Sequence, residues 1–253
     1  MKKIIKFTDA DFKKVANNLY DLLLSYSNLL EKNDLSRDSI NYQKRLNFER
    51  NFVLSVIIRL NRLLLDYPEA VILWDIDGVI GRNNQNVDDR LNVEFEIRPS
   101  LPLLFFRIKE VYPKCIFGVI TSGTQKHLEK VIFNADLHSR KIDIQKYFDS
   151  NFLFSVNSMS ISYFDENYPE EYDKFFHGDE MKYEGLKGYA NNSGTNMDKI
   201  KSMRIIMLEK QYPNSKIIPI DDLIYADYLD GITIKNNEVY YSLFTSVLKF
   251  IKF

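Results

Sequence analysis

Glycine and proline, the residues that most often interrupt helices, are absent from the first 67 residues of this 253-residue chain. Pro68 is the first proline and Gly78 is the first of 9 glycines. A stretch of this length without either residue favours helix, because no proline ring or flexible glycine disturbs the backbone hydrogen bonds. We therefore predict an α-helical hairpin over residues 1–67, followed by a differently organised domain over residues 68–253.

Two helices account for this N-terminal part. Thr8 is a predicted N-cap, and Asp9 and Asp11 fall in the first turn, where the helix dipole favours negative charge. Asn33-Asp34 marks a turn, and a second helix is predicted from about residue 36 to residue 65. Such a hairpin would pack its apolar stripe on the rest of the protein. In the first helix, the apolar residues at helical spacing are Phe12, Val15, Leu19, Leu22, Leu23, Tyr26 and Leu30.

Short apolar runs alternate with helix-like segments after Pro68. The strand candidates are residues 71–74, 93–97, 115–120, 152–156, 216–220 and 232–235. Strands separated by helices predict an α/β fold, here a doubly wound, Rossmann-like parallel sheet with helices on both faces. Residues 157–196 have no clean period and are predicted to form an irregular insertion. Pro219 is unexpected in a central strand, so either that strand is irregular or its backbone nitrogen points away from a neighbour.

Composition excludes several classes of protein. The chain has 34 Lys and Arg against 35 Asp and Glu, so no overall basic field attracts a phosphate backbone, which disfavours general nucleic-acid binding. One cysteine cannot form an internal disulfide, which points to a reducing compartment. No apolar run approaches the roughly 20 residues that cross a bilayer. We expect a soluble, cytoplasmic protein without a membrane partner.

Polar residues follow several of the predicted strands. In a doubly wound sheet, ligands bind outside the carboxyl ends of the strands, so these residues are expected to lie at one edge. The four elements, in chain order, are Asp75-Ile76-Asp77-Gly78, Thr121-Ser122-Gly123, Lys199 near the start of a helix, and Asp221-Asp222 with Asp227 five residues later.

This ordered set resembles the motifs of the haloacid dehalogenase-like (HAD-like) superfamily of phosphatases and phosphotransferases. The resemblance covers residues 70–253 and implies catalysis through an aspartyl-phosphate. Asp75 is the implied nucleophile. Asp77 is the implied general acid and base, which protonates the leaving oxygen and then deprotonates the attacking water. Lys199 is the implied catalytic lysine, with Lys201 as the alternative.

The same resemblance implies a phosphate-binding set and a metal site. Thr121 would donate its hydroxyl to phosphate oxygens, the backbone N–H groups of Ser122 and Gly123 would bind the anion at a helix N-terminus, and Lys199 would neutralise its charge. Mg²⁺ prefers hard oxygen ligands. Its implied ligands are the carboxylates of Asp75 and Asp222 and the carbonyl of Asp77, with Asp221 or Asp227 holding metal-bound waters.

Each of these features also has an ordinary structural interpretation. Asp75 and Asp77 could be turn carboxylates, Thr121 and Ser122 could simply cap a helix, and Lys199 could be a solvated lysine. The chain has three histidines, His127, His138 and His177. They show no metal-ligand spacing and are predicted to be surface or packing residues.

Asp77 separates two kinds of chemistry. Dehalogenases that the chain resembles need no leaving-group proton, so a second aspartate favours a Mg²⁺-dependent phosphatase acting on phosphomonoesters. The spacing leaves no room for a large cap, which predicts an open site and a bulky substrate such as a phosphoprotein, although a small phosphomonoester also fits. The alternative is an interaction protein with a vestigial core, in which the N-terminal helices bind a partner. A polynucleotide-end phosphatase would need a basic groove near Asp75.

Overall fold

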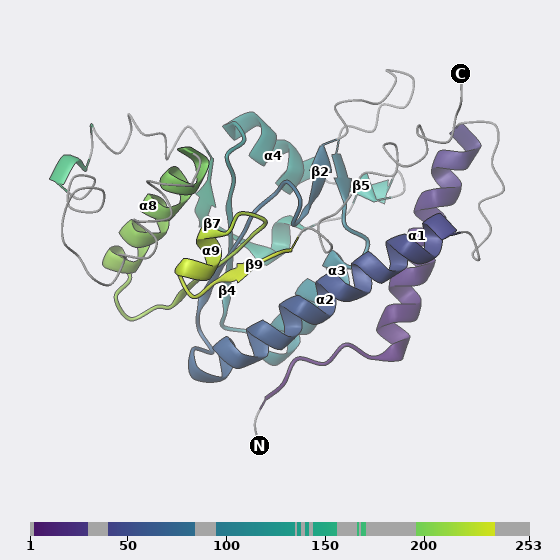
Figure 1. Cartoon of the computed structure of the whole chain (residues 1–253), viewed down its shortest axis with the longest axis horizontal. Helices are drawn as coiled ribbons and strands as arrows, with labels where there is room; N and C mark the ends of the chain where they lie inside the picture. The colour runs from purple at the N-terminus through teal and green to yellow at the C-terminus, as the bar shows by residue number, and fades with distance from the viewer. Residues whose placement is uncertain are drawn as a thin grey trace.

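A computed structural model of the chain has an α/β fold, which confirms the predicted class (Figure 1). Among the described residues, five strands form a sheet in the order β7-β4-β1-β8-β9, and every adjacent pair is parallel. The strands are β1 (Val71–Trp74), β4 (Ile116–Ile120), β7 (Phe148–Phe154), β8 (Ile217–Asp221) and β9 (Ile232–Thr233). The structure describes residues 3–29, 40–83, 95–134, 136–137, 140–141, 144–155, 166, 168–170 and 196–235.

A smaller sheet lies beside the first one. Its order is β2-β3-β5-β6, and β2 and β3 pair in antiparallel fashion. Its strands are β2 (Gly81–Asn83), β3 (Phe95–Ile97), β5 (Asp136–Leu137) and β6 (Arg140–Lys141). The strand β2 begins directly after the polar loop that follows β1, so this sheet borders the predicted site.

The parallel sheet carries apolar side chains on both faces, as expected when both faces are covered. Ile72 and Trp74 of β1 belong to one core cluster, together with residues of α2 (Ile40–Asp66), α3 (Leu101–Val111) and α4 (Gln125–Asn134). Val71 and Leu73 belong to a second cluster with residues of α8 (Asn196–Gln211) and of the short α9 (Tyr225–Tyr228). Because the alternating residues of one strand separate into two cores, β1 lies at the centre of the fold.

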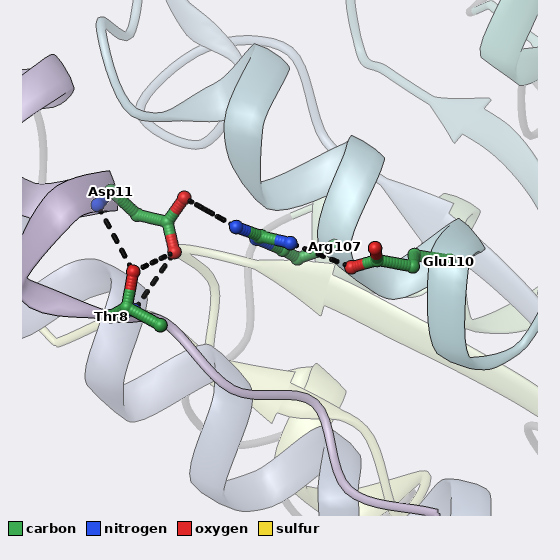
Figure 2. Close-up of polar contacts among 4 residues, drawn as sticks. All are labelled: Thr8, Asp11, Arg107 and Glu110. Atoms are coloured by element: carbon green, nitrogen blue, oxygen red, sulfur yellow. Dashed lines mark hydrogen bonds and ion pairs between the residues drawn. The ribbon is translucent and has the colours of Figure 1, made fainter.

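The first helix, α1 (Asp9–Leu29), begins with reciprocal capping bonds. The Thr8 backbone N–H donates to Asp11 Oδ2 over 2.8 Å, and the Asp11 N–H donates to Thr8 Oγ1 over 3.3 Å, so the predicted Thr8 cap is confirmed. Arg107 of α3 donates to Asp11 Oδ1 over 2.9 Å and also pairs with Glu110 (Figure 2). This network attaches the start of α1 to α3.

The helices α1 and α2 contact each other, and the Tyr42 hydroxyl donates to the Ala16 carbonyl over 2.9 Å. Figure 1 shows that they run in clearly different directions. The predicted turn at residues 33–34 lies outside the described residues, as does almost all of the predicted insertion at 157–196. Within the described part of the chain, every helix is too short or too polar to span a bilayer.

Pro219 does lie in a central strand, because β8 pairs with β1 on one side and β9 on the other. The carbonyls of Lys216 and Ile220 accept bonds from β1, so the backbone nitrogen of Pro219 faces β9 instead. The β9 pairing begins only at Ile220, next to Gly231. A Cβ atom at Gly231 would lie 2.4 Å from the Pro219 carbonyl oxygen, so glycine permits this close approach. The strand therefore loses no hydrogen bond to β1.

Candidate active site

Asp75 lies at the carboxyl end of β1 and is buried. Its backbone N–H donates to the Ile220 carbonyl over 2.9 Å, which extends the β1–β8 ladder by one residue. Asp221 and Asp222 follow Ile220, so the two strand ends bring three carboxylates together. One oxygen from each of Asp75, Asp221 and Asp222 lies within 4.8 Å of the others. The convergence expected from the sequence is therefore present for these three residues.

The lysine in this cluster is Lys201, so the structure corrects the assignment of Lys199. Lys201 Nζ lies 2.8 Å from Asp75 Oδ1 and 2.7 Å from Asp221 Oδ2, and the side chain is buried. Residues two apart on a helix point to different sides, so Lys199 and Lys201 cannot share this position. Burial alone lowers the pKa of Lys201, but the charges of Asp221 and Asp75 raise it above its usual value, so the ammonium stays protonated.

The two aspartates of the acidic pair differ in their surroundings. Asp221 is buried, and its carboxylate accepts bonds from Lys201 Nζ and the Tyr225 hydroxyl, both over 2.7 Å, and from the Leu223 N–H over 2.9 Å. Asp222 is exposed. Since protein donors already occupy the oxygens of Asp221, Asp222 is the member of the pair better placed to bind a ligand directly.

Gly78 brings the loop after β1 close to Asp222. Its φ of 86° is in the region that glycine adopts most easily. A Cβ atom at this position would lie 2.9 Å from Asp222 Oδ2. The glycine of the Asp75-Ile76-Asp77-Gly78 sequence thus permits both the turn and the approach of a carboxylate to the backbone.

The charges of the cluster do not balance. Burial raises the pKa of Asp75 well above its usual value, and the neighbouring Asp221 raises it further, against the opposing effect of Lys201. Asp222 is exposed on one side, but its carboxyl lies against the buried cluster, where partial desolvation and the charge of Asp221 raise its pKa to about 6. Three carboxylates with one ammonium carry excess negative charge when ionised. A hard divalent cation would neutralise that excess, and carboxylate oxygens are the ligands that Mg²⁺ prefers.

Asp77, two residues after Asp75 in the chain, contacts His127. The Asp77 side chain is half exposed, and its Oδ2 lies 3.3 Å from His127 Nε2. His127 is in the first turn of α4, where its N–H donates to Thr124 Oγ1 over 3.3 Å. The interpretation of His127 as an ordinary surface or packing residue did not anticipate this contact. The available signal was its position in the first turn of the helix that follows a polar strand end.

The Thr121 loop is at the same edge, because β4 is the other neighbour of β1. Thr121 is buried, and Ser122 is exposed. The Gly123 N–H, expected to bind phosphate, donates to Thr121 Oγ1 over 3.0 Å. A Cβ atom at Gly123 would lie 2.6 Å from His127 Cδ2, so the loop and α4 pack tightly. The Thr121 hydroxyl hydrogen can still donate, whereas the Gly123 N–H would have to break its bond first.

Asp227, expected to hold a metal-bound water, lies outside the carboxylate cluster. It is paired with Arg59 of α2 and accepts a bond from the Thr233 N–H over 3.2 Å. Arg59 also donates to the Thr233 carbonyl over 3.1 Å. These contacts give Asp227 a structural role, in which it connects α9 to α2 and β9.

Comparisons of the chain with protein-family models, with curated proteins and with solved structures gave no match. The functional conclusion therefore depends on the chemistry of the residues at this edge of the sheet.

Proposed function

We propose that this chain is a Mg²⁺-dependent, HAD-like phosphatase that hydrolyses phosphomonoesters through an aspartyl-phosphate on Asp75. The observation that carries the proposal is the convergence of Asp75, Asp221, Asp222 and Lys201 at the carboxyl ends of β1 and β8. The proposal includes a doubly wound, Rossmann-like core, supported by the two apolar clusters on β1, and an N-terminal helical hairpin formed by α1 and α2. A phosphoprotein or a small phosphomonoester is the proposed substrate, in a reducing, cytoplasmic setting.

Asp75 and Asp222 would hold the metal through their carboxylates and Asp77 through its carbonyl. When bound, Mg²⁺ would offset the repulsion between the phosphate and the attacking carboxylate. Lys201 holds one oxygen of Asp75 by a hydrogen bond, which orients the other oxygen toward a substrate. Asp221 in turn holds Lys201, so it acts as a positioning residue.

The reaction has two steps in this proposal. An oxygen of Asp75 attacks phosphorus and forms a P–O bond, while the bond from phosphorus to the leaving oxygen breaks and Asp77 donates a proton to that oxygen. Asp77 then removes a proton from a water molecule whose oxygen attacks phosphorus. The bond from phosphorus to Asp75 breaks, which releases phosphate and restores the carboxylate. Thr121 would donate its hydroxyl to a phosphate oxygen.

Hydrolysis of p-nitrophenyl phosphate tests the proposal. We expect Mg²⁺-dependent release of p-nitrophenol that chelation with EDTA removes and that Asp75→Asn abolishes. Asp227→Asn is the matched control, because it changes a nearby carboxylate outside the cluster and should retain turnover. Absence of turnover with several phosphomonoesters, together with absence of Mg²⁺ binding, would contradict the proposal.

That negative result would favour an interaction protein with a vestigial core. One observation supports this second candidate: Leu54, Ile58 and Leu65 lie on one side of α2 and are exposed, with Ile58 67% exposed. A polynucleotide-end phosphatase has less support, because the exposed Asp77 and Asp222 add negative charge to the described part of the site's rim.

A further inference from the structure

A buried arginine, Arg98, donates hydrogen bonds to the backbone of the loop that carries Asp75 and Asp77. Within the loop, the N–H groups of Ile80 and Gly81 donate to the carbonyls of Asp75 and Ile76 over 3.2 and 3.0 Å. Two further carbonyls of the loop point to the Arg98 side chain. Arg98 Nη2 donates to the Gly78 carbonyl over 2.9 Å, and Nε donates to the Val79 carbonyl over 3.1 Å. The guanidinium therefore binds the carbonyls of two consecutive residues in the loop that follows Asp75, the proposed nucleophile.

Arg98 is itself fixed by residues of α2. Its Nη1 donates to Glu49 Oε1 over 3.0 Å, and its guanidinium carbon lies 3.8 Å from the centre of the Phe52 ring. The other oxygen of Glu49 accepts bonds from the backbone N–H and the hydroxyl of Ser100. The side chains of Arg98 and Glu49 are 0% and 1% exposed. Together, these contacts hold the guanidinium in one orientation.

A buried ion pair is costly to form, and well-packed apolar residues often serve stability equally well. The rigid fork of arginine, however, reaches several acceptors at fixed angles, which neither lysine nor an apolar residue can do. Here the fork reaches the carbonyl of Gly78, the residue whose backbone faces Asp222. Glu49 holds Arg98, and Arg98 holds the loop that carries Asp75 and Asp77 and that lies against Asp222. The position of Glu49 on α2 therefore affects how these three aspartates are placed relative to one another.

We propose that Glu49 and Arg98 are positioning residues, which hold the loop at residues 75–81 in the geometry that the reaction needs. The catalytic part of this inference rests on the proposed function. The structural part, that the pair holds the loop, can be tested without any turnover.

The experiment uses the full chain with Glu49→Gln, Arg98→Lys and the double variant Glu49→Gln/Arg98→Met. The double variant removes both charges, so it avoids a buried charge without a partner if a single variant fails to fold. Arg107→Met is the control, because it removes a different ion pair, the one with Asp11 (Figure 2), and leaves Glu49 and Arg98 in place. Two measurements are made on each: hydrogen exchange of the Gly78, Ile80 and Gly81 amides, and kcat and KM with p-nitrophenyl phosphate.

In the folded double variant, we expect faster exchange of these amides and a kcat about 10–100-fold lower, with KM changed less than about twofold, since misplacement of a reacting group mainly slows the chemical step. Arg98→Lys keeps the charge but not the fork and should give a smaller loss. Arg107→Met should match the wild type in both measurements. Wild-type loop exchange and kcat in the double variant would overturn the inference. If the wild type shows no turnover with several phosphomonoesters and no Mg²⁺ binding, the proposed function fails, and the exchange data alone decide whether the pair holds the loop.

Discussion

Replacing Lys201 with methionine provides a direct test of the buried charge cluster. The substitution keeps most of the length of the side chain but removes the ammonium that lies 2.8 Å from Asp75 and 2.7 Å from Asp221. Removing one partner of a buried ion pair typically costs about 3–5 kcal/mol, because the remaining charge is left without compensation. We expect the free energy of unfolding to fall by about 3 kcal/mol at pH 8 in metal-free buffer, since burial of the lysine itself already has a cost.

The loss should depend on pH. Protonation neutralises carboxylates, and the pKa values of Asp75 and Asp222 are already raised, the latter to about 6. At pH 5 these groups take up protons, so the missing ammonium matters less and the destabilisation should be smaller than at pH 8. Urea unfolding followed by circular dichroism at the two pH values measures both quantities.

The matched control is Lys199→Met. Lys199 is on the same helix but is only half-buried, and its replacement leaves the ammonium of Lys201 in place, so we expect a loss of about 1 kcal/mol or less. Equal losses for the two variants, or a loss for Lys201→Met that does not change with pH, would refute this description of the site.

Three further predictions concern the same edge of the sheet. Gly78→Ala should lower the free energy of unfolding by roughly 1–2 kcal/mol, measured with urea, because φ at this position is 86°. It should also weaken Mg²⁺ binding, measured by calorimetry, because the new Cβ would lie 2.9 Å from Asp222 Oδ2. Unchanged stability and affinity would contradict this prediction. The folded pKa of Asp222 is about 6 against an ordinary 3.8, so its ionisation makes the metal-free protein less stable as pH rises from about 4 to about 6, with the loss complete above that range. Mg²⁺ should therefore raise the Tm more at pH 7.5 than at pH 5, and an equal rise at both would count against the site. His127→Asn should lower kcat roughly tenfold with little change in Mg²⁺ affinity, because it removes the contact with Asp77; wild-type kcat would show that the contact has no role.

The sequence predicted the α/β class and the positions of the strands that form the site. The apolar runs before Asp75 and Thr121 became β1 and β4, and the run before the acidic pair became β8. Such predictions succeed because a short apolar run that ends in a polar group has few stable alternatives in a globular fold. The edge at which the strands end then follows from the parallel topology.

The placements that differ from expectation concern directions that a single sequence does not specify. Lys199 and Lys201 both lie on α8, and only the rotation of that helix against the sheet determines which of them faces Asp75. Asp227 has suitable spacing for a metal site, but the arginine that pairs with it comes from α2, which is 168 residues away in the chain. The contact of His127 with Asp77 likewise depends on how α4 packs against the loop.

The ion pair between Glu49 and Arg98 limits where the chain can be cut into separate fragments. The boundary suggested by Pro68 separates the helices from the sheet, yet the carboxylate that balances Arg98 comes from the helical side of it. A fragment that starts at Pro68 would lack both the Glu49 carboxylate that balances Arg98 and the Phe52 ring that covers its guanidinium. The arginine that supports the peptide groups beside Asp75 would then no longer be fixed. A chimera that replaces the N-terminal helices would therefore also have to replace the segment around Arg98 and Ser100, because both residues bond to Glu49.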